Sequence, residues 1–267
     1  PEDAVRSAPD GALFWPTSVA LDSQGNAYVA DEWLNRISMF AKDGEWIGQW
    51  GTPGDGPGEI NRPSGMAFDA NDNLYLVDSV NHRVQVFTKE GKFLSTWGRL
   101  GTGDGDFDHP WGIDIDKDGN VYVADWRNDR IQKFSPDGQF LMTFGSSGQG
   151  EGEFNRPTGV AVDKDGTIYV ADYKNDRLQV FNADGRFITQ LTGEATLSKW
   201  GTERVKLDPL IGRGREIAQG LEEREKAFQG PIAVDVDDEG RVFVVEVSRH
   251  RVQVFYKQTA DFSGGPL

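Results

Sequence analysis

The feature that most constrains this chain is a tandem repeat. A block that opens on a proline and runs through V-A-D to Q-V-F begins at Pro16, Pro63, Pro110, Pro157 and Pro231, at intervals of 47, 47, 47 and 74 residues. Each copy holds short alternating runs of Val, Ile, Tyr and Phe separated by Asp-Gly turn signals, which is typical of antiparallel hairpins. We expect four strands per copy, in the first at 18–22, 26–30, 36–40 and 46–50.

A repeat of this length predicts the architecture. A four-stranded unit of 47 residues cannot bury both faces alone, so the units must stack around an axis. The prediction is an all-β β-propeller over residues 16–256, in which the last copy stops after its third strand near Tyr256. Residues 1–15 are expected to be a remnant of a preceding blade or a closing strand, and 257–267 a tail.

The repeated residues resemble the NHL family. The shared patterns are P-x-G-[VI]-A-V-D, then G-x-[VI]-Y-V-A-D, then N-[DH]-R-[IV]-Q-V-F and a Gly-rich connector, over most of 16–256 except 194–230. The resemblance implies six blades, with the sixth built from sequence upstream of residue 1 or from part of 194–230. It also implies an interaction platform, because such domains mostly serve as one.

Charge and composition exclude several classes of function. The net charge is −15, from 43 acidic and 28 basic residues, so nucleic acid is an unfavourable partner. The absence of cysteine excludes disulfides and thiolate metal sites. No apolar run approaches the roughly 20 residues of a membrane span. The chain starts at Pro1 without an initiator methionine, which favours a processed extracytoplasmic protein, although the compartment and the oligomeric state stay open.

Every copy carries an acid at the end of its second strand and an arginine five residues later. A metal or acid–base ring is conceivable, but repetition in every blade favours a structural acid–arginine pair. The acids are Asp31, Asp78, Asp125, Asp172 and Glu246, and the arginines are Arg36, Arg83, Arg130, Arg177 and Arg251.

The Gly-rich connectors allow a phosphate-loop reading and a calcium reading. No helix follows G-T-G-D-G to bind a phosphate, and Asp104 and Asp106 lack the spacing of a full calcium loop. We therefore expect the glycines to shape the crossing between blades, while Ile60, Phe107 and Phe154 enter the core.

Binding residues are expected where one blade differs from the others. Strand direction places the strand starts, the loops after V-A-D and the connectors on one face, and aromatic and basic side chains collect there. Trp, Tyr and Arg on the loops of a rigid scaffold are usual binding anchors, although a Trp between blades can also be packing. The candidates are Trp33, Trp111, Trp126, Arg127, Tyr173 and Lys174.

A 27-residue excess lies within 194–230, where 216–228 has near-helical spacing of apolar residues. This short helical insertion is either a lid or docking arm on the same face, or a packed plug. Separately, Asp114 and Asp235 replace the alanines of the other copies on strand one. If they line the channel, they could hold calcium or another divalent cation; otherwise they are solvated or arginine-paired.

Two functions from different classes remain open. The first is a binding scaffold for a protein, peptide or glycan, without a cofactor. The second is a metal-assisted lactone or ester hydrolase with a cation at Asp114 and Asp235. Amidating lyases of related architecture place zinc-binding histidines directly after the strand-start proline, a position held here by other residue types, and His82, His109 and His250 lie elsewhere. We therefore lean away from an enzyme.

Overall fold

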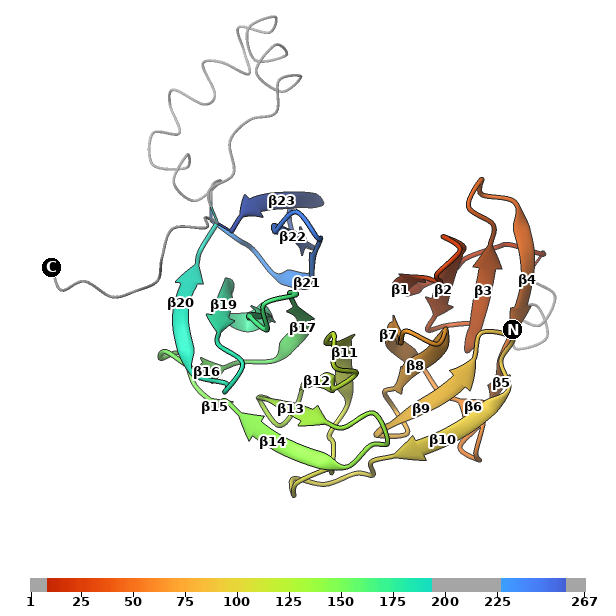
Figure 1. The fold of residues 1–267 in the computed structure, drawn as a ribbon, viewed down its shortest axis with the longest axis horizontal. Helices are drawn as coiled ribbons and strands as arrows, with labels where there is room; N and C mark the ends of the chain where they lie inside the picture. Colours follow the sequence, from red (N-terminus) through yellow and green to blue (C-terminus); the bar gives the residue numbers. More distant parts are fainter. Residues whose placement is uncertain (1–8, 194–226, 258–267) are drawn as a thin grey trace, which may run out of the picture.

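The structure is a computed structural model that describes residues 9–193 and 227–257. These residues form five antiparallel sheets arranged as an arc around a common axis (Figure 1). Their helical content is one 3-10 turn, Tyr173–Asn175. The prediction of an all-β propeller is therefore confirmed, while nearly all of the helix expected at 216–228 lies outside the described residues.

Four blades have four strands and the fifth has three. The strands are β1 (Pro16–Leu21), β2 (Ala27–Asp31), β3 (Arg36–Phe40), β4 (Trp46–Trp50); β7 (Pro63–Phe68), β8 (Asn73–Asp78), β9 (Arg83–Thr88), β10 (Phe93–Trp97); β11 (Pro110–Ile115), β12 (Val121–Asp125), β13 (Arg130–Phe134), β14 (Phe140–Phe144); β17 (Pro157–Val162), β18 (Ile168–Asp172), β19 (Arg177–Phe181), β20 (Phe187–Leu191); β21 (Pro231–Val236), β22 (Arg241–Glu246) and β23 (Arg251–Tyr256). Two connectors contain short parallel pairs, β5 (Thr52–Pro53) with β6 (Glu59–Ile60) and β15 (Ser146–Ser147) with β16 (Glu153–Phe154).

The expectation of six blades is wrong for the described part of the chain, which forms five. A blade needs its own strand-forming runs, and within the described ranges these runs occur in the five recognisable copies. In Figure 1 the arc stays open between the first blade, β1–β4, and the fifth, β21–β23. In the first blade, the predicted strand bounds agree with the observed ones to within two residues. The largest deviation is at the start of β1, because Pro16 already pairs with Asp31 across a bulge.

The hydrophobic core lies between neighbouring blades. Between the third and fourth blades, Ile131 and Phe154 pack against Val160, Ile168 and Phe181. The connector side chains Ile60, Phe107 and Phe154 have no exposed surface, which confirms that the connectors insert into the core. Each connector therefore joins two blades twice, through the backbone crossing and through one buried apolar side chain.

The two terminal blades each leave an apolar sheet face accessible. Val19 and Leu21 on β1 are 63% and 61% exposed, and Val252 and Val254 on β23 are 55% and 44% exposed. Their counterparts in the middle blades are largely buried between sheets. The open ends of the arc thus present the same kind of surface that the repeat covers elsewhere.

Glycine in the P-x-G motif lets inner strands approach one another. A Cβ atom on Gly112 of β11 would lie 2.4 Å from the carbonyl oxygen of Thr158 on β17. Gly65 faces Trp111 in the same way, with a Cβ position 2.6 Å from that carbonyl oxygen. The motif therefore sets the spacing of neighbouring blades at the axis.

We predict that Gly112→Ala lowers the free energy of unfolding by about 1–3 kcal/mol, because the extra methyl group must push two inner strands apart. The measurement is a thermal melt. Gly103→Ala is the control, since the nearest atom to its Cβ is the movable Asp106 carboxylate at 3.1 Å. Equal melting temperatures for the two variants would contradict the close-approach argument.

Candidate functional site

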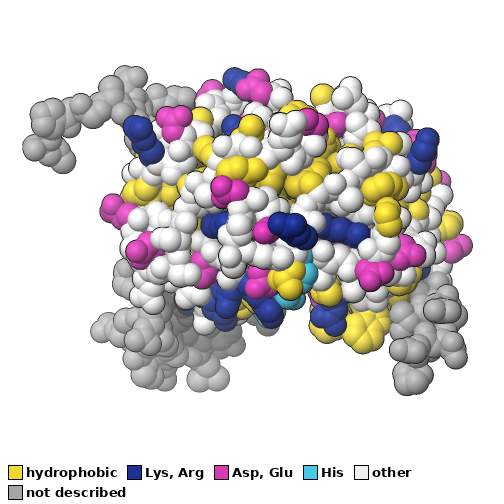
Figure 2. Space-filling model, turned by 90° about the horizontal axis from the view of Figure 1, so that it is seen from below, with side chains coloured by type: hydrophobic (Ala, Val, Ile, Leu, Met, Phe, Trp, Pro, Cys, Tyr) yellow, Lys and Arg dark blue, Asp and Glu magenta, His cyan; other side chains and the backbone are white. Residues whose placement is uncertain are grey.

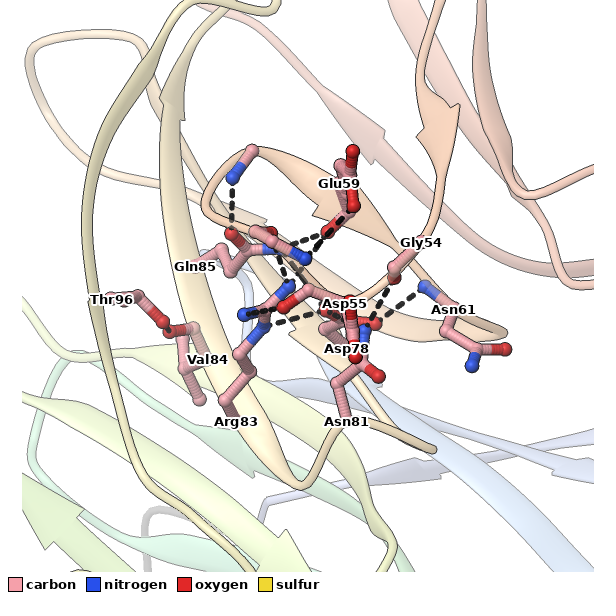
Figure 3. A network of polar contacts seen from close by, with 12 residues as sticks. Gly54, Asp55, Glu59, Asn61, Asp78, Asn81, Arg83, Val84, Gln85 and Thr96 are labelled. Carbon is pink, nitrogen blue, oxygen red and sulfur yellow. Dashed lines mark hydrogen bonds and ion pairs between the residues drawn. The ribbon is translucent and has the colours of Figure 1, made fainter.

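The acid–arginine pairs are structural links within the blades. In the second blade, Asp78 has no exposed surface, and Arg83 Nε donates to its Oδ2 at 2.8 Å (Figure 3). The same guanidinium donates to the carbonyl oxygens of Asp55, Gly56 and Glu59 in the preceding connector. Matching pairs form at Asp125–Arg130, Asp172–Arg177 and Glu246–Arg251. These carboxylates are already bound to arginines of the same blade, which argues against a ring of carboxylates that binds a metal ion.

The first blade departs from this rule. The Asp31 carboxylate accepts backbone N–H groups of Phe14, Trp15, Trp33 and Leu34 instead of the arginine. Arg36 donates through Nη2 to the carbonyl oxygen of Ala12, while its Nε has no hydrogen-bond partner among the described residues. The paired arrangement predicted for all five copies therefore holds in four.

A second link joins each blade to the next. A turn residue with positive φ accepts the backbone N–H of the residue that precedes the next strand-start proline. These bonds are Arg62 N to Asn35 Oδ1, His109 N to His82 Nδ1, Arg156 N to Asp129 Oδ1 and Gly230 N to Asp176 Oδ1. His82 thus does at one junction what asparagine or aspartate does at the others.

Three of the predicted binding residues come together in the third blade. The rings of Trp111 and Trp126 lie 6.5 Å apart, and the Arg127 guanidinium lies 5.5 Å from the Trp126 ring centre. Arg156, from the following connector, lies 5.0 Å from the same ring. We call these four residues the Trp–Arg cluster. Arg156 was missed by the sequence analysis, although the N-R-P connector pattern marks its position.

Trp111 interrupts a structural pattern at the strand starts. Thr17 and Ser64 hold this position in the first two blades, and their hydroxyls donate to the carbonyl oxygens of Pro63 and Trp111 in the next blade. Thr158 makes the matching bond to Pro231. An indole cannot make this O–H bond, so the third blade gives up a link and gains an aromatic side chain on the loop face.

The other predicted binding residues lie in separate groups. Lys174 is exposed, and its Nζ lies 4.5 Å from the Tyr173 ring centre. Trp33 is 46% exposed and lies 5.7 Å from Trp15. Trp33 also lines an open pocket of about 860 Å³ at the junction of the first two blades, together with Arg62. None of these contacts joins the three groups, so a shared binding site for all six residues stays a prediction.

Beside the Trp–Arg cluster lies a group of His82, Asp108 and His109. His109 Nδ1 and Asp108 Oδ1 are 2.6 Å apart, and His82 Nδ1 is 3.8 Å from the same oxygen. Burial, reinforced by His109, lowers the pKa of His82, so its ring is neutral at physiological pH. Figure 2 shows histidine surface in the lower part of the view, next to hydrophobic and cationic side chains.

Asp114 is held by backbone N–H groups and not by an arginine, whereas Asp235 is exposed. Asp114 on β11 is partly accessible, and it accepts backbone N–H groups of Val162, on the neighbouring blade, and Ile115. Burial raises the pKa of Asp114 to about 7, and the charge of Asp235 adds to this shift. The grouping of possible metal ligands in the described ranges is His82, Asp108 and His109, which leaves the channel cation as a hypothesis.

The connector acid Asp106 has a local partner. Arg99 Nε donates to Asp106 Oδ1 at 2.8 Å, so this carboxylate has a partner within its own connector.

None of the helical structure in residues 9–193 and 227–257 has the length and hydropathy of a membrane-spanning helix.

Comparison with known proteins supports the fold. The family model of the NHL repeat matches residues 61–87, 107–134, 154–181 and 228–255. No curated protein sequence matches the chain. Among solved structures, virginiamycin B lyase from Staphylococcus aureus is similar with a TM-score of 0.55 and 12% identity, over 92% of this chain and 71% of that one.

Two further structures are similar at this level. A protein of unknown function from Bacteroides thetaiotaomicron has a TM-score of 0.59 and 20% identity, over 88% of this chain and 57% of that one. A nidogen/laminin complex contains a chain with a TM-score of 0.57 and 17% identity, over 91% of this chain and 80% of that one. At these identities the similarity concerns the fold alone.

Proposed function

Because the chain is an NHL-repeat β-propeller, we propose that it is a binding scaffold whose loop face engages a protein, peptide or glycan. The observation that carries the proposal is the Trp–Arg cluster. Two indoles and two guanidiniums lie together, and Trp111 holds the strand-start position that has a small hydroxyl residue in three of the other four blades. The third blade therefore differs from the repeat at residues that the fold does not require.

The chemistry of the cluster indicates the kind of ligand. Trp111 and Trp126 offer flat apolar surface, which suits sugar rings and aromatic or proline side chains. Arg127 is exposed and Arg156 covers the same indole, so a carboxylate or another acidic group can be held beside the stacked surface. An acidic peptide or an acidic glycan fits this combination best. Tyr173 with Lys174, and Trp33 in its pocket, would extend the contact along the face.

We predict that Trp126→Ala weakens binding at least about 30-fold, because loss of an aromatic hot-spot residue costs about 2 kcal/mol or more. The measurement is an affinity capture from host lysate and culture fluid, followed by titration of the purified partner against wild type and variant. Leu141→Ala is the matched control, since Leu141 is 49% exposed on β14 of the same blade. A partner that binds all three proteins equally would rule out the Trp–Arg cluster as its site.

A further inference from the structure

The junction between the second and third blades differs from the others in its chemistry. Three other junctions use asparagine or aspartate as acceptor, and two of them place arginine after it, as in Asn35 with Arg62 and Asp129 with Arg156. This junction alone among the described ones brings two imidazoles together, His82 and His109, with ring centres 4.6 Å apart. The bond between the blades requires an acceptor at position 82, but it uses only the backbone N–H of residue 109 and does not require a histidine side chain there.

The donor atoms converge as a metal site requires. One ligand atom each from His82, Asp108 and His109 lies within 4.8 Å of the other two. Donors around a tetrahedral zinc ion are about 3.3 Å apart, given metal–ligand distances of about 2.0–2.2 Å. The spacings of 2.6 and 3.8 Å from Asp108 Oδ1 to His109 Nδ1 and His82 Nδ1 lie on either side of this value. His82 Nδ1 accepts the backbone N–H of His109, so metal binding through this atom replaces that hydrogen bond.

We propose that His82, Asp108 and His109 bind a divalent transition-metal ion, with Zn²⁺ as the best fit. Imidazole nitrogen with one carboxylate oxygen is a zinc-type donor set, whereas calcium and magnesium prefer oxygen ligands throughout. The ion replaces the hydrogen bond between His109 Nδ1 and Asp108 Oδ1, so its binding releases one proton to solvent. Three protein ligands leave one tetrahedral position open to water or to a ligand group.

The surroundings of the site are compatible with a cation. The three side chains are between 15% and 29% exposed, which allows entry while keeping the donors in place. Arg127 Nη1 lies 4.0 Å from Asp108 Oδ1, but its side chain is 46% exposed, so water screens its charge at the site. Asp108 is also held from behind, because its backbone N–H donates to Asp125 Oδ1. The site adjoins the Trp–Arg cluster, yet it stands independently of the proposed function.

The repeat supplies variants that should remove the metal without harming the fold. His109→Arg installs the residue found at Arg62 and Arg156, and His82→Asn installs the acceptor found at Asn35. His250→Asn is the matched control, since His250 occupies the same positive-φ turn position in the fifth blade. All three variants should melt like the wild type in the presence of a chelator.

The test is calorimetric titration of the purified chain with Zn²⁺ in excess Ca²⁺, which occupies non-specific carboxylate sites. We expect one saturable zinc site in wild type and in His250→Asn. We expect binding at least about 100-fold weaker in His109→Arg and His82→Asn, because even outer-sphere changes cost 10–100-fold. Zinc should also raise the melting temperature of the wild type, and it should leave the melting temperatures of His109→Arg and His82→Asn unchanged.

Two results would overturn the proposal. One is the absence of saturable zinc binding in wild type. The other is binding that survives both His109→Arg and His82→Asn, which would place the ion elsewhere. Partner capture by the Trp126→Ala series is measured separately, so failure of the zinc site leaves the binding-scaffold proposal intact.

Discussion

Arg130→Ala is expected to lower the free energy of unfolding by roughly 3–5 kcal/mol, the usual cost of removing one partner from a buried ion pair. The Asp125 carboxylate has no exposed surface and lies 2.9 Å from Arg130 Nε. Alanine leaves the buried Asp125 carboxylate without the positive charge that compensates it. It also removes donors from the carbonyl oxygens of Thr102, Gly103 and Asp106, which tie the connector to β13. The check is equilibrium denaturation followed by far-ultraviolet circular dichroism.

The connector supplies a matched control for this prediction. Arg99 also pairs with a carboxylate, Asp106 Oδ1 at 2.8 Å, but its side chain is 83% exposed. An exposed ion pair contributes little because water solvates both charges and the side chains lose entropy. Arg99→Ala should therefore leave the denaturation curve unchanged. If Arg130→Ala were as mild as Arg99→Ala, the acid–arginine network would not be a structural link.

The repeat made most of this network predictable. An acid and an arginine that recur in every copy have to serve the blade, and four copies show the pair. The first copy does not, because the same two residue types can be satisfied in another way. The Asp31 carboxylate accepts hydrogen bonds from four backbone N–H groups. A sequence pattern does not show how many backbone donors reach a carboxylate.

The candidate site was less accessible to sequence reasoning. Trp111, Trp126 and Arg127 were found because they break the repeat, and the contact of Arg127 with Trp126 is local in sequence. Arg156 reaches Trp126 from the next connector, and it resembles Arg62 closely enough to look like part of the repeat. The pairing of His82 with His109 spans 27 residues and depends on two backbone turns with positive φ.

The blade count shows a different limit. Repeats reveal how many units a chain contains, whereas closure depends on twist and on contacts between the first and last units. The family resemblance implied six blades, but the described residues form five and the arc is open beside β1. Equivalent apolar positions, such as Val252 on β23, can therefore be buried in one blade and exposed in another.

Asp114→Ala is expected to flatten the fall in stability that the wild type shows between about pH 4 and pH 7. The ordinary carboxyl pKa is 3.8, and burial raises the pKa of Asp114 to about 7. A raised pKa in the folded state means that the folded chain binds the proton more tightly than the unfolded chain. The contribution of Asp114 is thus fully present below pH 3.8 and is lost as the pH rises through about 7.

The size of this effect follows from the two pKa values. A difference of about 3 pH units corresponds to an upper limit of roughly 4 kcal/mol, at about 1.4 kcal/mol for each unit. Alanine is the natural replacement because Ala20, Ala67 and Ala161 hold this position in three other blades. Alanine also loses the hydrogen bonds from Val162 and Ile115, but that loss changes little with pH.

The decisive quantity is therefore the difference between two pH values and not the melting temperature at one of them. Melting temperatures of wild type and Asp114→Ala should converge, or cross in favour of the variant, as the pH is raised from 5 to 8. Asp235→Ala is the comparison. Burial also raises the pKa of Asp235, and its charge adds to the shift at Asp114, so this variant should flatten the pH dependence in the same direction. Parallel pH curves for wild type and Asp114→Ala would mean that Asp114 stays ionised in the fold. In that case a cation or another donor must compensate its charge at the axis, which would return weight to the hydrolase hypothesis.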